Sequence, residues 1–331
     1  MHSKIVIALF SSSLMLNLAA CQNTQSGTKF IAGVFNASTN IQKKFIDKHA
    51  PKDVLVYNNI QYMANPNLHM DVYQPEYIAE IGARPTVVWI HGGGWISGSK
   101  EHARGYFKLL ASKGYNVVAV EYQFAPDAVY PTQLHQINQA LSYLQMNAAQ
   151  YHIDASKLYL AGDSAGANMA SHYAAFVSNS DYAQSQNFQP AITRKQLQGL
   201  ILHCGIYDLN HFVETAPDEI RLLEWGINNL VQAYTGERKN DAEFLSSISP
   251  RQHVNQNYPP VFISGGNKDF LTASQSLPFV ETLKANQVPV TEAFYPDSKE
   301  LLVHEYQFMM SKKASQQTFD RTVEFLNQLT P

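Results

Sequence analysis

From residue 54 onward, short apolar runs alternate with longer segments whose apolar residues recur every three or four positions. The first pattern is typical of strands, continuous runs being typical of strands buried on both faces, and the second is typical of helices. The pattern predicts strands at residues 54–63, 68–73, 86–91, 117–122, 158–161, 200–203, 261–264 and 288–295. It predicts helices at residues 102–112, 132–149, 166–178, 274–285 and 311–329. This alternation indicates an α/β fold, with a mostly parallel sheet covered by helices on both faces.

Two segments depart from the alternation. Residues 29–49 carry apolar positions that predict one or two short amphipathic helices ending before Pro51. Residues 207–249 contain many large apolar residues but no obvious strand, which predicts a helical insertion between two strands of the sheet. Such an insertion would either add packing or form a cap over a site.

The composition supports a globular fold and excludes several classes of protein. Of the 331 residues, 45% are hydrophobic and 11% aromatic, which is enough for a large core. The net charge of −3 gives no electrostatic case for binding nucleic acid. The two cysteines cannot form a disulfide framework, and Cys204, at the end of an apolar run, is expected to be a buried structural thiol. The sequence has no common metal-binding or phosphate-binding motif, so we expect neither a metal nor a cofactor.

The N-terminus has the features of a secretion signal, because a lysine precedes an apolar run too short to span a membrane comfortably. The following Leu18-Ala19-Ala20-Cys21 resembles the lipobox of bacterial lipoproteins. This resemblance implies that residues 1–20 are removed and that acyl chains on Cys21 anchor the protein to a lipid bilayer. In that pattern, Gln22 in place of aspartate implies the outer membrane of a Gram-negative cell envelope.

The first candidate for chemistry is Gly162-Asp163-Ser164-Ala165-Gly166, between a predicted strand and a predicted helix. In a G-x-S-x-G sequence the serine lies on a sharp, strained turn, and the two glycines let neighbouring backbones approach. The helix that follows directs backbone N–H groups toward negative charge developing beside Ser164. This context indicates that Ser164 is a nucleophile.

A second motif, His91-Gly92-Gly93-Gly94-Trp95, directly follows a predicted strand. Three glycines leave backbone amides unshielded, which is what an oxyanion hole requires. The alternative is an ordinary glycine-rich turn. The position upstream of a G-x-S-x-G motif favours the oxyanion hole.

Together, these two motifs resemble those of the hormone-sensitive-lipase-like branch of the α/β-hydrolase esterases. Residues 121–127 (EYQFAPD) are similar to that family's D-Y-R-L-A-P-E segment, with Gln123 in place of arginine and the terminal acids exchanged. The resemblance extends from Val54 to the C-terminus. It implies an α/β-hydrolase fold, a helical cap formed by the N-terminal helices and residues 207–249, and oxyanion donors on Gly93, Gly94 and Ala165.

A serine nucleophile needs a base that is oriented by an acid, and α/β-hydrolases place these in the order serine, acid, histidine. His304 is the only histidine after Asp269, and it lies between the last predicted strand and the last predicted helix. Asp269 follows the strand predicted at residues 261–264 and resembles the family's D-x-L position, so we take it as the acid. Asp208 and Asp297 also follow strands and remain alternatives.

Other titratable residues near these motifs receive different interpretations. His91, His102 and His203 would be near the site without being the base, and His253 comes in the wrong order for Asp269. Asp163, inside the serine motif, and Glu305, beside the histidine, are interpreted as structural or solvated residues.

The resulting prediction is a serine carboxylesterase in which Ser164 attacks an ester, His304 takes the proton and Asp269 holds the imidazole. The resemblance implies short- to medium-chain acyl or aryl esters as substrates. Arylformamidase and carbohydrate deacetylase use the same three residues and are alternatives; a catalytically silent surface lipoprotein is disfavoured by the complete set. The domain prediction is a signal peptide (1–20), a tether and N-terminal cap segment (21–53), and a catalytic domain (54–331). The sequence does not determine the oligomeric state.

Overall fold

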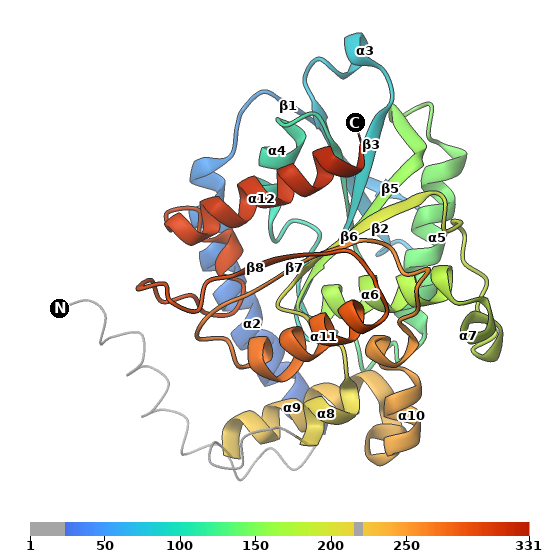
Figure 1. Cartoon of the computed structure of the whole chain (residues 1–331), viewed down its shortest axis with the longest axis vertical. Helices are drawn as coiled ribbons and strands as arrows, with labels where there is room; N and C mark the ends of the chain where they lie inside the picture. The colour runs from blue at the N-terminus through green and yellow to red at the C-terminus, as the bar shows by residue number, and fades with distance from the viewer. Residues whose placement is uncertain (1–23, 215–220, 331) are drawn as a thin grey trace.

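The computed structural model describes residues 24–214 and 221–330, which build an eight-stranded sheet (Figure 1). Its strands, in chain order, are β1 (Val54–Gln61), β2 (His69–Pro75), β3 (Arg84–Ile90), β4 (Asn116–Val120), β5 (Ile153–Asp163), β6 (Leu197–His203), β7 (Val261–Gly265) and β8 (Val290–Phe294). Their order in the sheet is β1-β2-β4-β3-β5-β6-β7-β8. The β1–β2 and β2–β4 pairs are antiparallel and the remaining five pairs are parallel. The predicted α/β fold with a mostly parallel sheet is confirmed.

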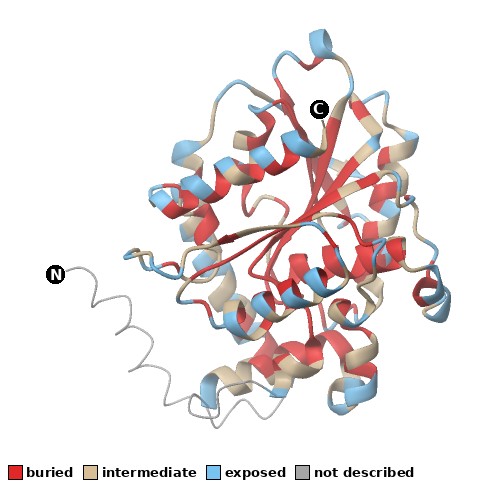
Figure 2. Cartoon of the chain, in the orientation of Figure 1, coloured by how far each residue is buried: buried red, intermediate tan, exposed pale blue. Residues whose placement is uncertain are grey.

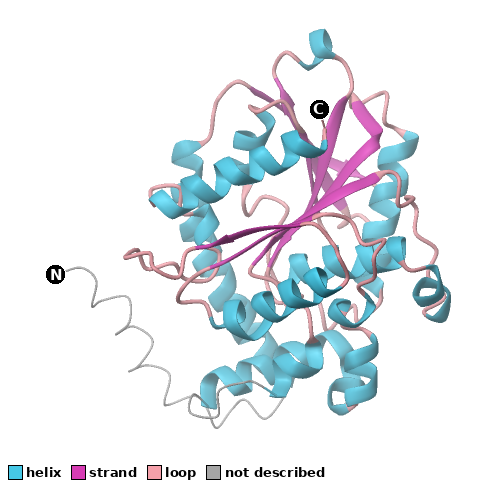
Figure 3. Ribbon diagram, viewed as in Figure 1, coloured by secondary structure: helices cyan, strands magenta, loops and turns pink. Residues whose placement is uncertain are grey.

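The helices connect the strands and cover the sheet (Figure 3). They are α2 (Thr24–Ile46), α3 (Ile78–Ile81), α4 (Arg104–Ala111), α5 (Thr132–Met146), α6 (Ala165–Ser178), α7 (Ser180–Ser185), α8 (Leu209–Glu214), α9 (Arg221–Thr235), α10 (Ala242–Ser247), α11 (Leu277–Ala285) and α12 (Lys313–Leu329). Short 3₁₀ turns lie at Asp47–His49, Gly236–Asn240, Pro250–His253 and Tyr306–Phe308, and a π turn at Thr272–Ser276 precedes α11. In these described residues, no helix has both the length and the apolar character needed to cross a bilayer.

Side chains that alternate along each strand divide the core into two layers. On β3, Val87 and Trp89 pack with α4 and α12, whereas Val88 and Ile90 pack with α5, α6 and α11. This period of two follows from the pleat of a strand. Figure 2 shows the consequence, because the central strands are buried along most of their length while the outer faces of the helices are exposed.

Two segments that are far apart in the sequence lie together at one end of the molecule. The N-terminal helix α2 contacts α9, which lies at the lower end of the view in Figure 1, and α2 runs upward from there. Residues from both helices line a cavity together with Ser164, which directly follows β5. The described residues of the segment 207–249 contain α8, α9, α10 and no strand. The two segments that depart from strand–helix alternation, residues 29–49 and 207–249, therefore lie together over the ends of the strands.

Candidate active site

Ser164 occupies a strained turn between β5 and α6. Its backbone has φ 53° and ψ −119°, a conformation that residues with a side chain rarely adopt. A Cβ atom added to Gly166 would overlap the carbonyl oxygen of Ile90, so only glycine lets the first turn of α6 lie this close to β3. The serine motif thus folds as the strand–turn–helix that its sequence predicts.

The glycine loop after β3 is fixed to the serine turn through Asp163. The Gly92 amide donates a hydrogen bond of 2.8 Å to Asp163 Oδ2, and the Trp89 indole donates one of 2.8 Å to Oδ1. Asp163 is buried, and each of its two carboxylate oxygens accepts one of these hydrogen bonds. The structural interpretation of Asp163 is consistent with these contacts.

The next two glycines of this loop face the cavity that contains Ser164. Gly94 has φ 60°, and a Cβ atom there would approach the Leu230 side chain to 2.6 Å. Gly93 and Gly94 both line the cavity, and Ala165 begins α6 beside the serine. The three proposed oxyanion donors therefore lie on two segments that border Ser164, namely the glycine loop and the start of α6.

The structure brings His304 to Asp269 and separates it from the other candidate acids. His304 Nδ1 lies 2.8 Å from Asp269 Oδ2, and Asp269 Oδ1 accepts a hydrogen bond of 3.1 Å from the Leu271 amide. The carboxylate of Asp208 instead faces Arg251, at 3.6 Å, and Asp297 is exposed. With Nδ1 held by Asp269, Nε2 is the imidazole nitrogen available for a proton from the serine.

The histidines that were not chosen as the base have structural environments. His91 stacks on Tyr122, and burial lowers the pKa of His102 and of His203 to about 4. His253 stacks on the Tyr182 ring with a centroid distance of 3.4 Å. Burial thus keeps His102 and His203 neutral near pH 7.

Cys204 is buried as predicted, but its position next to the candidate base was not anticipated. The Cys204 Sγ, an Asp269 carboxylate oxygen and a His304 ring nitrogen all lie within 4.8 Å of one another. Burial raises the pKa of the Cys204 thiol to about 11, so the thiol is neutral at pH 7. Cys204 directly follows β6, the neighbour of β7 in the sheet, and this adjacency arises only in the folded chain.

Opposing effects act on the imidazole of His304. Burial disfavours its charged form, whereas Cys204 and the Asp269 carboxylate raise the pKa of His304 well above its ordinary value. Because the Cys204 thiol is neutral near pH 7, the carboxylate of Asp269 is the charge that favours the imidazolium there. This is the arrangement that a base needs if it is to hold a proton during a reaction.

Glu305 is enclosed beneath the glycine loop, so the solvated alternative for this residue is wrong. Its side chain is only 12% exposed, and a Cβ atom on Gly92 would lie 3.2 Å from its Oε1. Burial and the charge of Asp163 raise the pKa of Glu305 to about 8. Sequence patterning does not predict this burial, because Glu305 lies in a loop and the groups that enclose it are distant in the chain.

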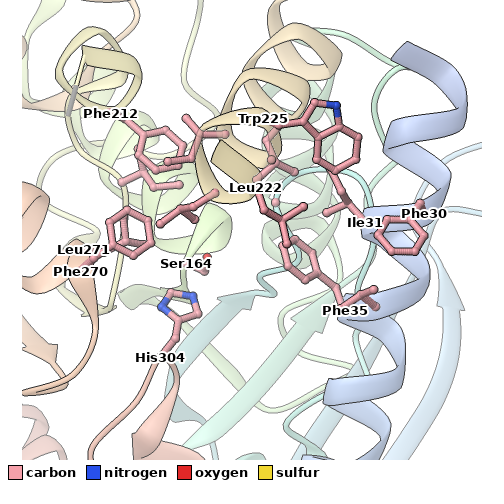
Figure 4. Close-up of a pocket in the computed structure, with 17 residues that line it drawn as sticks. Phe30, Ile31, Phe35, Ser164, Phe212, Leu222, Trp225, Phe270, Leu271 and His304 are labelled. Atoms are coloured by element: carbon pink, nitrogen blue, oxygen red, sulfur yellow. The ribbon is translucent and has the colours of Figure 1, made fainter. Parts of the chain in front are cut away.

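Ser164 and His304 line both of two neighbouring arms of a cavity, one of which is shown in Figure 4. One arm has a volume of about 410 Å³; apart from the Trp225 indole, its polar side chains are those of Ser164 and His304. We call this the apolar arm. The other arm, of about 630 Å³, is lined in part by polar side chains, namely Ser38, Thr39, Gln42, Glu305, Ser311 and Lys312. We call it the mixed arm; the two arms share Phe35 and Gly94 as well as Ser164 and His304.

Comparisons with known proteins agree with this geometry. The model of the BD-FAE family matches residues 70–283, which contain the glycine loop, the serine turn and Asp269. The chain is 27% identical over 251 residues to the probable carboxylic ester hydrolase LipM of Mycobacterium tuberculosis. That similarity covers 75% of this chain and 55% of the relative, so the chain spans about half the length of that protein.

Solved structures share the fold over nearly the whole chain. An esterase B from Lactobacillus rhamnosis, inhibited by a tributyrin phosphonate, superposes with a TM-score of 0.79 and 22% identity, covering 93% of this chain and 96% of the other. A Pyrobaculum calidifontis esterase gives a TM-score of 0.71 and 21% identity, covering 91% of this chain and 93% of the other. A truncated carbohydrate esterase from gut microbiota gives 0.69 and 18%, covering 85% and 99%. At these identities the likeness establishes the α/β-hydrolase fold.

Proposed function

The chain belongs to the BD-FAE family, and from its site we propose that it is a serine carboxylesterase acting on short- to medium-chain acyl or aryl esters. Ser164 attacks the ester carbonyl while His304 accepts its proton, and Asp269 holds the imidazole through Nδ1. Backbone N–H groups of Gly93, Gly94 and Ala165 stabilise the oxyanion; one such donor typically contributes about 3 kcal/mol. Water activated by His304 then releases the acyl group from Ser164.

The observation that carries this proposal is a hydrogen-bonded His304–Asp269 pair that opens, together with Ser164, into an apolar arm. An acetyl group would leave most of the apolar arm's volume of about 410 Å³ unfilled. The apolar arm thus favours a longer acyl or aryl group over the acetyl group of a polysaccharide.

The mixed arm suits the alcohol part of the ester. It is lined by Val303, His304 and Glu305, so it lies along the loop that carries the base. The base must later protonate the departing alkoxide, and this requires the alcohol to leave on the His304 side. Polar side chains in this arm would tolerate an alcohol that carries hydroxyl or charged groups.

The proposal is tested by measuring kcat/KM for p-nitrophenyl esters from acetate to decanoate, with N-formylkynurenine and an acetylated oligosaccharide in parallel. We expect the highest kcat/KM for a chain longer than acetate. Ser164→Ala should lower kcat by roughly 10⁴-fold or more. Equal rates in the parent and in Ser164→Ala, or no hydrolysis of any ester, would exclude a serine esterase. Preferred hydrolysis of the formamide or of the acetylated sugar would favour those alternatives.

We also propose that the protein is a lipoprotein of the cell envelope, anchored through acylated Cys21 to the outer membrane of a Gram-negative bacterium. Residues 1–23 lie outside the described residues, so this proposal rests on the apolar run and on Leu18-Ala19-Ala20-Cys21. The test is fractionation and mass spectrometry of the full-length protein and of Cys21→Ala. Acylation predicts that the variant leaves the membrane fraction and loses the lipid mass; an unchanged mass and distribution contradict it.

A further inference from the structure

Five large apolar side chains surround the openings of the two arms and remain exposed to solvent. Phe30 is 45% exposed, Ile41 59%, Phe45 56%, Leu222 37% and Phe270 38%. Phe30, Leu222 and Phe270 line the apolar arm, as Figure 4 shows, whereas Ile41 and Phe45 line the mixed arm. We call these five residues the rim. Apolar side chains gathered at a cavity opening, in contrast to single ones scattered over a surface, mark a site of interaction.

Most of the rim lies on one face of α2. One side of the helix carries Phe30, Val34, Ile41 and Phe45, because these residues are spaced at intervals of four, seven and four positions. Other positions of the same helix, including Ile31, are buried in the core. A surface helix needs only one apolar face to pack on its own protein. The second apolar face of α2 is therefore available for another partner.

Polar contacts fix α2 so that this second face stays outward. Gln42 Nε2 donates a hydrogen bond of 3.1 Å to the carbonyl oxygen of Glu305, and Lys43 Nζ lies 2.5 Å from a carboxylate oxygen of Glu101. At the middle of the helix, Asn36 Oδ1 accepts a hydrogen bond of 3.3 Å from the Gly98 amide. Turning the exposed face inward would break all three contacts.

The charges beside the rim identify the kind of partner. Helix α2 contains no aspartate or glutamate, and Lys29, Lys44 and the nearby Lys48 are exposed. Across residues 24–214 and 221–330, no acidic side chain forms an ion pair with any of these lysines. Lys48 Nζ lies 5.0 Å from the centroid of the Phe45 ring, so a cation and an aromatic face occur together. Lysines beside aromatic and aliphatic side chains are typical of helices that bind anionic lipid surfaces, whereas protein–protein interfaces are depleted in lysine.

We propose that the rim, with Lys29, Lys44 and Lys48, docks on a lipid bilayer that carries anionic headgroups. In this orientation the openings of both arms face the bilayer, and an apolar ester reaches Ser164 from the lipid rather than from bulk water. The proposed anchor at Cys21 is compatible with this geometry, since Cys21 precedes Thr24 by three residues, which span at most about 10 Å. Docking goes beyond anchoring because it fixes the orientation of the molecule.

The test uses the full-length chain carrying Cys21→Ser, so that acylation does not contribute to binding. Partitioning onto sedimented vesicles is compared for pure phosphatidylcholine and for phosphatidylcholine mixed with phosphatidylglycerol. We expect stronger binding to the anionic vesicles, and a loss of at least about tenfold in the double variant Ile41→Asp with Phe45→Asp. Met146→Asp is the matched control, because Met146 is 75% exposed on α5 and lies outside the rim.

A second pair of substitutions tests the charges. Lys44→Gln with Lys48→Gln should lower binding to the anionic vesicles by roughly tenfold, leave binding to phosphatidylcholine unchanged, and leave hydrolysis of a water-soluble ester unchanged. Absence of vesicle binding, or equal binding by the Ile41/Phe45 and Met146 variants, overturns the proposal. A rim variant that converts a dimer to a monomer in light scattering, without a change in vesicle binding, assigns the surface to a second copy of this chain. Ser164→Ala should bind vesicles normally, so this result is independent of the esterase assay.

Discussion

In the proposed mechanism, the imidazole of His304 acts as a base only while it is neutral, so the pKa of His304 would set the pH range of activity. Since Cys204 and Asp269 raise the pKa of His304, the protonated, inactive form persists above pH 6.5. We therefore expect kcat/KM to rise with pH along one limb whose midpoint lies above 6.5. Asp269→Asn should move that midpoint to lower pH and reduce kcat by roughly 10⁴-fold. The measurement is a pH profile of p-nitrophenyl butyrate hydrolysis; an unchanged midpoint in the variant would contradict the role given to Asp269.

The titration of Glu305 should make the stability of the folded protein depend on pH. Its folded-state pKa is raised from 4.5 to about 8, so between these values the folded protein holds a proton that the unfolded chain has lost. The stability that this protonation contributes is present below pH 4.5 and is lost as pH rises toward 8. Glu305→Gln keeps the shape without the titration, so its Tm should decline less between pH 5 and 8 than that of the parent. Exposed Glu281→Gln is the control and should keep the parent's slope.

At the scale of elements, α9 forms one wall of the apolar arm and contains a glycine where a side chain would fit. A Cβ atom added to Gly226 meets no other atom within 4 Å, and Gly226 lines the arm. Gly226→Ala should therefore stabilise the protein by about 0.5–1 kcal/mol through helix propensity, with little effect on substrate preference.

Gly226→Phe should place a ring in the arm and shorten it. We expect kcat/KM for decanoate to fall at least about tenfold relative to acetate, because the longer chain loses its apolar contacts. Chain-length profiles of the parent, the alanine variant and the phenylalanine variant provide the comparison. Identical profiles in all three would show that the acyl group does not occupy this arm.

Most strands and helices of the fold can be predicted from the sequence. All eight strands form where apolar runs or alternation occur, because burial in the sheet requires such residues. Strand β5, however, begins at Ile153 and passes through polar Asp154, Ser156 and Lys157, which no hydrophobic pattern would assign to a strand. Of the one or two short helices expected at residues 29–49, the structure has one, α2, which is longer than expected because it begins at Thr24.

The sequence is sufficient to predict those parts of the site that are formed by one continuous segment of the chain. Ser164 follows from its motif, because strand, turn and helix are adjacent in the chain. The sequence favours Asp269 as the acid but does not exclude Asp208 or Asp297. In the structure, the hydrogen bond to His304 distinguishes Asp269 from both. The positions of Cys204 and Glu305 depend on the loops after β6 and β8, which approach each other only in the folded sheet.

At the scale of the whole molecule, three distant parts of the chain combine around Ser164. Helix α2 covers the site from one side, α9 covers it from another, and the loop carrying His304 follows β8 (Figure 1). Because both arms and the rim include residues of α2, this helix would link substrate selection to the position of the molecule on a membrane. On the proposed function, loops at the ends of the strands supply the reacting groups, and α2 and α9 select the esters that reach them.

The central claim is that an acyl group is carried by Ser164. It is tested most directly by treating the full-length protein with the p-nitrophenyl ester of an alkyl phosphonate and locating the adduct by intact-mass and peptide mass spectrometry. The account predicts one phosphonyl group on the peptide containing Ser164, loss of esterase activity in proportion to labelling, and no adduct in Ser164→Ala. An adduct on another residue, or full ester hydrolysis by Ser164→Ala, would contradict it.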